Sequence, residues 1–249
     1  QWYDNAPVEE GLAPPEFRII GEHTQGGFAE ACVVPAANLV GIPRDVPFEV
    51  AAAASLVSVT AWRGLMVRGG LRAGESVLIT GASGGVSTMA IQMARLAGAR
   101  IHAVTSGAEN VERVRNLGAH AVYDRTQGDW GKELFQNTDR RGVDLVFDSV
   151  GQAIWPQCLR ALSVGGRLVT YGATTGAAGE TEIRQVFWKP LSILGSTMGT
   201  PAQYREFMDV LFRGDVKAVI HEVLPLKELQ RAHEMLEAGE VFGKLVIVP

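Results

Sequence analysis

Six short apolar runs alternate with segments of helical pattern between residues 75 and 198, and this alternation constrains the fold more than any other feature of the chain. The runs are nearly continuous in Val, Ile and Leu, which is typical of strands covered by helices on both faces. The pattern therefore predicts an α/β fold with a doubly wound parallel sheet. The six expected strands are 76–80, 100–105, 121–123, 143–148, 167–171 and 191–197.

Helical patterns occupy the intervals between these runs, and further elements flank them on both sides. The expected helices of the alternating region are 86–96, 109–117, 130–136 and 154–162. On the N-terminal side we expect a strand at 28–34 and an Ala-rich helix at 49–67. On the C-terminal side we expect helices at 202–212 and 227–238 and strands at 219–224 and 244–248.

The strongest functional signal is the segment 80–86, Thr-Gly-Ala-Ser-Gly-Gly-Val, between the first expected strand and the next helix. Small residues let the main chain approach a pyrophosphate closely, and the first N–H groups of the helix point toward it. Only Gly84 of the strict G-x-G-x-x-G pattern is kept, because its outer positions are Ala82 and Ser87. The position between strand and helix nevertheless predicts a dinucleotide-binding turn.

The end of the second expected strand bears on which dinucleotide is bound. Residues 104–107 read Val-Thr-Ser-Gly, without the acidic side chain that would bind the ribose 2′-hydroxyl of NAD. Arg113 and Arg125 are candidates to hold a 2′-phosphate, because a planar guanidinium suits that group. Both can also be interpreted as solvated surface residues, and the position of Arg113 on a helix face favours that interpretation more than the position of Arg125 does. We expect NADP(H) as the cofactor, with NAD(H) as the alternative.

Charge and composition exclude several other classes of protein. The net charge of −4 and the absence of any Lys/Arg run longer than two argue against nucleic-acid binding. The apolar stretch 50–59 is much shorter than a membrane span, and the polar start of the chain does not resemble a signal peptide. The two cysteines, Cys32 and Cys158, fit a reducing compartment. We therefore expect a cytoplasmic protein with a small-molecule substrate.

Several short segments along nearly the whole chain match the motifs of one family, in the family's order. They are Ile20-Gly21-Glu22-His23, Gly27-Phe28-Ala29-Glu30, Thr60-Ala61-Trp62, Gly84-Gly85-Val86, Leu117-Gly118-Ala119, Phe147-Asp148-Ser149-Val150-Gly151 and Phe242-Gly243-Lys244-Leu245-Val246. In these segments the chain resembles the medium-chain dehydrogenase/reductase superfamily, in its quinone-oxidoreductase-like branch.

The resemblance implies a Rossmann domain at 58–200 and a β-rich, GroES-like catalytic domain divided between 1–57 and 201–249. By the same likeness the sequence starts late, so that the opening part of the catalytic domain is missing before Gln1. In this family the sixth strand pairs with its copy across a two-fold axis, and the resemblance thus implies a homodimer formed through 191–198.

The resemblance also implies roles for individual residues. Thr60 would pack near the nicotinamide, with Tyr171, Gly172 and Ala173 at its border. The remaining cofactor residues would be Ser83, Gly84, Gly85 and Val86 at the pyrophosphate, Thr105, Ser106 and Arg125 at the adenosine ribose and its phosphate, and Ser149 and Val150 along the channel between them.

Zinc relatives in this superfamily place a Cys or carboxylate ligand just before the Thr-Ala-Trp segment, where this chain has Leu56. Leucine has no donor atom, so we expect no zinc. The expected function is NADPH-dependent hydride transfer to a quinone or an α,β-unsaturated carbonyl compound. A zinc-dependent alcohol dehydrogenase with ligands upstream, and a nucleotide-binding relative without turnover, remain alternatives. We assign no catalytic residue from the sequence.

Overall fold

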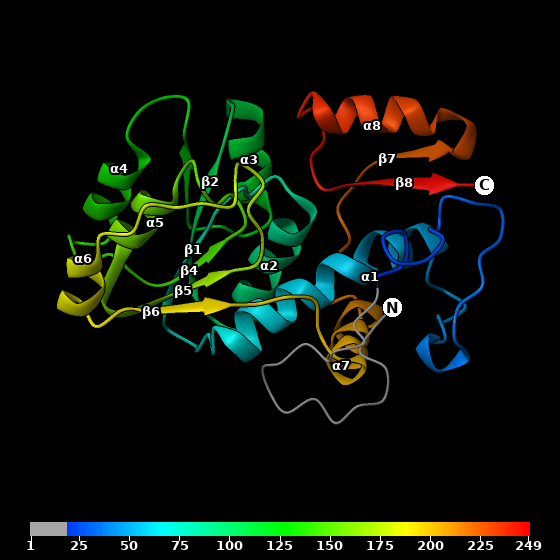
Figure 1. The fold of residues 1–249 in the computed structure, drawn as a ribbon, viewed down its shortest axis with the longest axis horizontal. Coiled ribbons are helices and arrows are strands. Elements are labelled where there is room, and N and C mark those ends of the chain that lie inside the picture. Colours follow the sequence, from blue (N-terminus) through cyan, green and yellow to red (C-terminus); the bar gives the residue numbers. More distant parts are fainter. Residues whose placement is uncertain (1–18) are drawn as a thin grey trace.

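A six-stranded parallel sheet forms the centre of the protein (Figure 1). The computed structural model describes residues 19–249. The strand order is β3-β2-β1-β4-β5-β6, which is the order of a Rossmann fold, and the predicted doubly wound sheet is confirmed. The strands are β1 (Ser76–Ile79), β2 (Arg100–Thr105), β3 (Ala121–Asp124), β4 (Val143–Asp148), β5 (Leu162–Thr170) and β6 (Ser192–Gly195).

Two apolar cores lie on the two faces of this sheet. Val77 and Ile79 of β1 belong to one core, whereas Leu78 between them belongs to the other, as the pleat of a strand requires. Helices α1 (Phe48–Trp62), α2 (Gly85–Leu96), α3 (Ala108–Asn116) and α7 (Pro201–Phe212) contribute to the first core, and α4 (Trp130–Asn137) and α5 (Trp155–Ala161) to the second. Both faces are covered, which explains the nearly continuous apolar strands.

Helix α1 continues without a break into a π-helical turn, η2 (Arg63–Arg68). The sequence-based limit of 50–59 for the apolar stretch was too short, because this helical stretch of 21 residues passes a length and hydropathy test for membrane spans. However, 61% of the tested window is buried inside the fold, where α1 packs on α2 and α7. That burial is typical of a core helix. The expected domain boundary at 57/58 falls inside α1.

A small two-stranded parallel sheet lies apart from the large sheet, on the right in Figure 1. It consists of β7 (Ile220–Pro225) and β8 (Lys244–Val248), with α8 (Leu229–Glu237) between them in the sequence. Both strands contact α1. The start of β8 reaches the glycine-rich turn, where Gly84 and Gly243 form an isolated bridge. The C-terminal segment thereby becomes part of the site described below.

Several elements differ from the sequence-based expectations. The segment 28–34 is not a strand, because it finds no partner strand among residues 19–249 and leaves Phe28 and Val33 exposed. β5 begins five residues earlier than expected, and β6 covers only the middle of 191–197. The expected helix 227–238 begins with a 3-10 turn, η3 (Leu226–Glu228), and the sequence did not predict η1 (Ala36–Asn38) or α6 (Ile183–Trp188).

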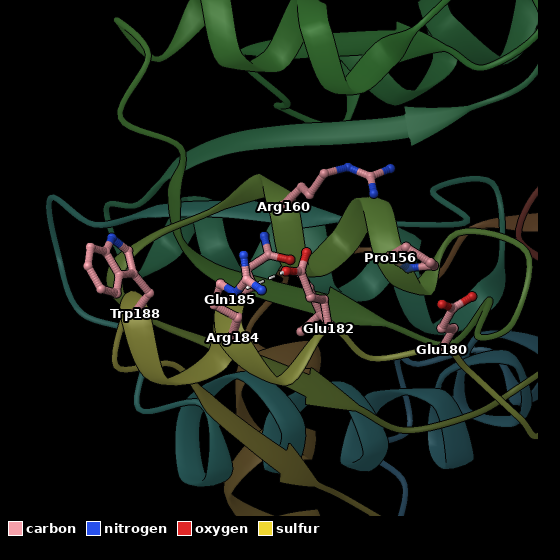
Figure 2. Close-up of a pocket in the computed structure, with 8 residues that line it drawn as sticks. Pro156, Arg160, Glu180, Glu182, Arg184, Gln185 and Trp188 are labelled. Atoms are coloured by element: carbon pink, nitrogen blue, oxygen red, sulfur yellow. Dashed lines mark ion pairs between the residues drawn. The ribbon is translucent and has the colours of Figure 1, made fainter.

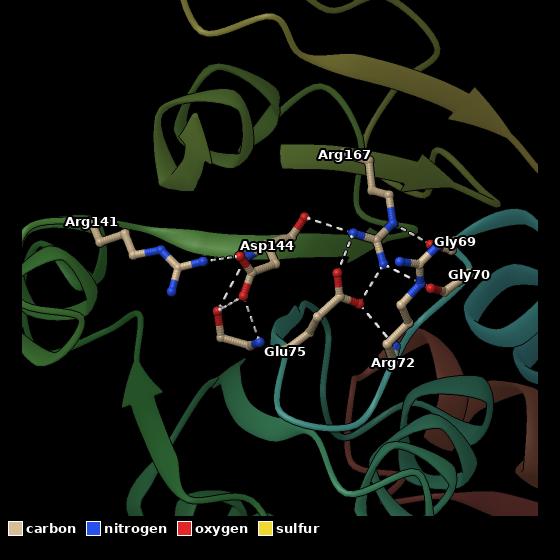
Figure 3. Close-up of polar contacts among 8 residues, drawn as sticks. Gly69, Gly70, Arg72, Glu75, Arg141, Asp144 and Arg167 are labelled. Atoms are coloured by element: carbon tan, nitrogen blue, oxygen red, sulfur yellow. Dashed lines mark hydrogen bonds and ion pairs between the residues drawn. The ribbon is translucent and has the colours of Figure 1, made fainter. Parts of the chain in front are cut away.

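A network of charged side chains ties the amino ends of the central strands together (Figure 3). The guanidinium of Arg167 in β5 makes two hydrogen bonds to the Glu75 carboxylate, at 2.7 and 3.0 Å, and also donates to the main-chain carbonyls of Gly69 and Gly70. Burial alone would raise the pKa of Glu75, but the bonds from Arg167 and from the Arg72 amide bring it below its ordinary value. The network fixes the loop that follows η2 to the base of the sheet.

Candidate cofactor and substrate site

The glycine-rich turn connects β1 to α2 at the carboxyl edge of the sheet. Gly81 adopts a left-handed conformation with φ +53°, and the Gly84 amide donates to the Gly81 carbonyl at 2.9 Å, which closes the turn. Gly84 then caps α2, so that the helix N-terminus opens at the turn as a pyrophosphate site requires. At Gly85 a Cβ atom would lie 2.5 Å from Cδ of Lys244 and 3.2 Å from Val57. Glycine is therefore the residue that this packing admits.

The C-terminal segment covers the same turn. The Gly243 amide donates a 2.8 Å hydrogen bond to the Ser83 carbonyl, and the Lys244 side chain extends over Gly85. Burial lowers the pKa of Lys244 below its ordinary value. A cation beside the start of α2 is placed to neutralise a pyrophosphate. Lys244 lies in one of the segments that resemble the family, but the sequence alone gave it no role. Only the fold brings its side chain to the glycine-rich turn.

The carboxyl end of β2 holds the residues expected at the adenosine ribose. Thr105 is buried, and its hydroxyl oxygen has no hydrogen-bond partner. The Arg125 amide donates to the Thr105 carbonyl at 3.0 Å, which places the exposed Arg125 beside Thr105 and Ser106. Asp124 accepts hydrogen bonds from the Thr126 hydroxyl and from the amides of Thr126 and Gly107. These bonds lower the pKa of Asp124, the Thr126 hydroxyl most. The unpartnered Thr105 hydroxyl and the nearby guanidinium fit a phosphorylated ribose.

Arg113, the other cation considered for a 2′-phosphate, is engaged elsewhere. Its guanidinium pairs with Glu109 on the same helix and lies over the Phe242 ring, 5.4 Å from the ring centroid. Phe242 belongs to the segment that covers the glycine-rich turn. Arg113 thus joins α3 to the C-terminal segment, and Arg125 remains the better candidate for a phosphate.

The loops after β4 and β5 are held in place by a buried carboxylate. Asp148 accepts hydrogen bonds from the Thr80 hydroxyl at 2.6 Å and from the amides of Val150 and Gly151 at 3.1 and 3.0 Å. These bonds fix the main chain of Ser149 and Val150 at the carboxyl end of β4. Gly151 has φ +79°, and a Cβ there would lie 2.9 Å from Ala173, so the two loops touch.

Tyr171 follows β5 and connects this loop to α2. Its ring stacks on Phe147 with centroids 4.1 Å apart, and its hydroxyl lies 3.2 Å from the Ser87 hydroxyl. Burial raises the pKa of Tyr171 to about 12, so the phenol stays protonated at neutral pH. Thr60, also expected near the nicotinamide, is buried in the last turn of α1 and donates to the Leu56 carbonyl at 3.1 Å.

A pocket of about 580 Å³ opens at the carboxyl ends of β5 and β6. Ligands of doubly wound sheets bind at this edge. The pocket brings together Tyr171, Gly172 and Ala173, which the sequence assigned to the nicotinamide, with Arg63, Arg68 and Ser196, which it did not single out. Its full lining is Arg63, Arg68, Thr170, Tyr171, Gly172, Ala173, Gly195, Ser196 and Thr197.

A second pocket of similar volume lies between α5 and α6 (Figure 2). Arg160, Glu182 and Arg184 surround it, with the aromatic side chain of Trp188 at one side, and Glu182 pairs with Arg184 at 3.9 Å. Its charges of both signs and its distance along the fold from the glycine-rich turn set it apart from the cofactor site. The pocket at the ends of β5 and β6 is therefore the better candidate for a substrate site.

The residues that the structure describes do not fit a zinc centre. No group of three or more His, Cys, Asp or Glu side chains that could hold a metal ion occurs among residues 19–249. Leu56 lies half-exposed on α1, and His23 accepts a hydrogen bond from the Ile19 amide within a turn. The nicotinamide cofactor, in contrast, fits the turn, the helix N-terminus and the unpartnered hydroxyl at β2.

Comparison with known proteins agrees with this geometry. The profile of a family described as zinc-binding dehydrogenase matches residues 85–213, which is more than half of the chain. The chain belongs to this family. Zinc-binding dehydrogenases form part of the medium-chain dehydrogenase/reductase superfamily, so the resemblance seen in the sequence is confirmed. The protein is an oxidoreductase of this type and uses a nicotinamide cofactor.

Two curated relatives illustrate the range of the family. An acryloyl-coenzyme A reductase of Sulfurisphaera tokodaii is 28% identical over 92% of this chain and 67% of its own length. A quinone oxidoreductase of Pseudomonas aeruginosa is 30% identical over 90% of this chain and 72% of its own length.

Solved structures show the same range. An NAD-dependent alcohol dehydrogenase is 38% identical with a TM-score of 0.90, and 94% of this chain corresponds to 68% of that one. The 2-octenoyl-CoA carboxylase reductase CinF, solved with NADP and 2-octenoyl-CoA, is 28% identical with a TM-score of 0.85, and 91% of this chain corresponds to 55% of that one. Within this zinc-binding dehydrogenase family the cofactor phosphate and the acceptor therefore differ between members.

Proposed function

We propose that this zinc-binding dehydrogenase relative is an NADPH-dependent reductase of quinones or α,β-unsaturated carbonyl compounds that works without zinc. The observation that carries the proposal is the pocket at β5 and β6, which brings Tyr171, Gly172 and Ala173, the residues expected at the nicotinamide, together with two arginines. Relatives named quinone oxidoreductase and acryloyl-coenzyme A reductase support this class of acceptor. Leu56, where zinc relatives have a ligand, supports the zinc-free part of the proposal.

In this proposal the chain binds and orients two planar partners. The amides at the start of α2 and the Lys244 ammonium hold the pyrophosphate, while Thr105, Ser106 and Arg125 hold the phosphorylated ribose. The bound cofactor supplies a hydride to the acceptor. A conjugated acceptor spreads the resulting negative charge to its oxygen, so it depends less on a metal than a simple ketone does. Tyr171, held by Phe147 and Ser87, gives the pocket a fixed wall.

The test is oxidation of NADPH and of NADH, followed at 340 nm, by the purified protein with any upstream residues that its gene encodes. A simple quinone and an enone are tested as acceptors for the reduced cofactors, and an alcohol is tested as a donor to the oxidised cofactors. Each assay is run with and without a chelator. Chelator-insensitive oxidation of NADPH by the quinone or the enone is the expected result. Chelator-sensitive turnover of the alcohol would instead establish a zinc-dependent alcohol dehydrogenase. Tight NADPH binding without turnover of any acceptor would establish a nucleotide-binding relative.

A further inference from the structure

Arg63 is a deeply buried cation beside the pocket at β5 and β6. It is the first residue of the π-helical turn η2 and is 4% exposed. Its Nη1 donates to the neutral Oε1 of Gln203 at 3.3 Å, and its Nε atom has no hydrogen-bond partner. No acidic side chain within residues 19–249 forms an ion pair with it.

A buried charge without a partner lowers the stability of the fold when no ligand is bound. An unpaired charge removed from water destabilises a fold, so buried charges are normally paired. In the same protein Arg167, which is less deeply buried, has the Glu75 carboxylate and two carbonyls around it. Arg63 is thus poised for a partner of opposite charge.

The pocket beside Arg63 offers room for that partner. Arg68, one turn further along η2, lines the same pocket and donates from Nε to the Gly195 carbonyl at 2.9 Å. Ser196 adds a hydroxyl oxygen that is buried and unpartnered. None of the nine residues that line the pocket is acidic. Two guanidinium groups and one free hydroxyl therefore converge on one cavity at the substrate end of the fold.

We propose that Arg63, Arg68 and Ser196 form a subsite for an anionic oxygen group of the substrate, a carboxylate or a phosphate. This inference rests on the proposed function, because it takes the pocket at β5 and β6 as the place where the acceptor binds. A guanidinium suits both groups, since its N–H donors match two oxygens at once. The subsite selects acidic unsaturated compounds over neutral ones, and it is separate from the cofactor cations Lys244 and Arg125.

The test compares matched acceptors that differ only in the anion. 4-Oxopent-2-enoate is compared with its methyl ester, and crotonyl-phosphopantetheine with crotonyl-pantetheine, in NADPH oxidation assays. We expect kcat/KM for the anionic member of one pair to exceed that of its neutral partner by about tenfold or more. The pair that shows the preference distinguishes a carboxylate from a phosphate.

Three variants and one control connect the preference to the subsite. Arg63→Gln, Arg68→Gln and Ser196→Ala should each reduce the anionic-to-neutral ratio, the arginine variants by about fivefold or more. The ratio compares kcat/KM for the anionic and the neutral acceptor within the same variant, so a general loss of activity affects both values equally and leaves the ratio unchanged. Arg184→Gln, a change of an exposed arginine on α6, should leave the ratio as it is. If Arg63→Gln fails to fold, the half-buried Arg68 still carries the test.

Equal kcat/KM values within both pairs, or a preference that survives both arginine variants, would overturn the subsite while the proposed function stands. If neither a neutral quinone nor any of the unsaturated carbonyl compounds oxidises NADPH, the proposed function fails instead. Calorimetric titration of the NADP⁺ complex with 4-oxopent-2-enoate and its ester then decides the subsite alone, because it needs no turnover. An Arg63→Gln variant with a changed oligomeric mass and an unchanged ratio would show that a second copy supplies the anion.

Discussion

The main-chain amide of Gly243 donates a 2.8 Å hydrogen bond to the carbonyl oxygen of Ser83, although 160 residues separate them in the sequence. This bond joins the C-terminal segment to the cofactor turn. Gly243 has φ +86°, and a Cβ at this position would lie 2.3 Å from the Val219 carbonyl oxygen. The turn and the C-terminal strand therefore depend on a residue without a side chain.

Gly243→Ala should destabilise the protein and weaken NADPH binding together. The substitution adds a clash with main chain to the cost of a left-handed alanine, which is itself about 1 kcal/mol. Gly239→Ala is the matched control, because Gly239 has φ +72° with open space around its Cβ position. Urea unfolding should show a larger loss for Gly243→Ala than for Gly239→Ala. Equal losses would mean that the contact with Val219 does not matter.

Lys244→Gln should weaken the binding of NADPH and NADH to a similar degree. The pyrophosphate is common to both cofactors, and loss of a charge-assisted contact costs roughly 1.5–3 kcal/mol, or about tenfold to a hundredfold in Kd. Fluorescence titration of each reduced cofactor measures the effect. Lys227→Gln in η3 is the control, because it removes the same charge at a different place in the fold. An unchanged Kd for both cofactors would remove Lys244 from the pyrophosphate site.

Arg125→Gln should act on NADPH alone. Arg125 is exposed directly after β3, beside the end of β2, so we expect a modest effect of about fivefold to tenfold in the NADPH Kd. The NADH Kd should stay within experimental error, because NADH lacks the 2′-phosphate. The exposed Arg115 on α3 provides the control variant, Arg115→Gln. A parallel loss for both cofactors would contradict the assignment of Arg125 to the phosphate.

His102 should make the fold less stable at acidic pH. Burial, with smaller contributions from Arg100 and His120, lowers its pKa from 6.5 to about 4, and its Nδ1 lies 2.9 Å from the Tyr123 hydroxyl. Between these values the unfolded chain binds a proton that the folded protein excludes, so the free energy of unfolding decreases as the pH falls from about 6.5 to about 4.

The decrease due to His102 should be on the order of 3–3.5 kcal/mol over the whole interval, at about 1.4 kcal/mol for each unit of pKa, and roughly 2 kcal/mol of it should fall above pH 5. Denaturant unfolding at pH 7.5 and pH 5 measures the difference. His102→Gln should show a smaller decrease than the wild type over this interval, whereas His233→Gln, at an exposed position on α8, should behave like the wild type. Identical pH dependence of all three proteins would contradict the prediction.

The edge strand β6 is the place where we propose that a second copy binds. β6 lies at the end of the strand order, Ile193 is 40% exposed, and the neighbouring α6 exposes Ile183, Phe187 and Trp188. Open strand edges with apolar side chains favour pairing. Ile193→Lys should therefore lower the mass measured by light scattering from dimer to monomer, and Leu236→Lys on α8 should not. A wild-type monomer at micromolar concentration would rule out this interface.

The sequence was most informative where one apolar pattern determines both the secondary structure and the burial of a segment. The apolar runs predicted all six strands of the sheet, because strands covered on both faces leave few polar positions. It was less informative where a residue depends on distant neighbours. The segment 28–34 has the composition of a strand but no partner strand among the described residues, and β-structure needs a partner.

The residues of the candidate site divide in the same way. The glycine-rich turn was recognisable because its small residues and its place before a helix belong to one continuous segment. Arg63 and Lys244 were not, since each reads as an ordinary cation on its own element. Their importance comes from burial and from neighbours that the fold brings from α7, β6 and the turn.

Gly64, beside Arg63 in the π-helical turn, has a further consequence. A Cβ there would lie 2.3 Å from the Phe147 ring, and Phe147 in turn stacks on Tyr171. Three positions on η2, β4 and the loop after β5 thus share one volume, so none of them can change in size independently. Related sequences should vary at these positions in concert, with a larger residue at 64 accompanied by a smaller one at 147. Attempts to reshape the pocket by single substitutions at any of the three should be less productive than paired ones.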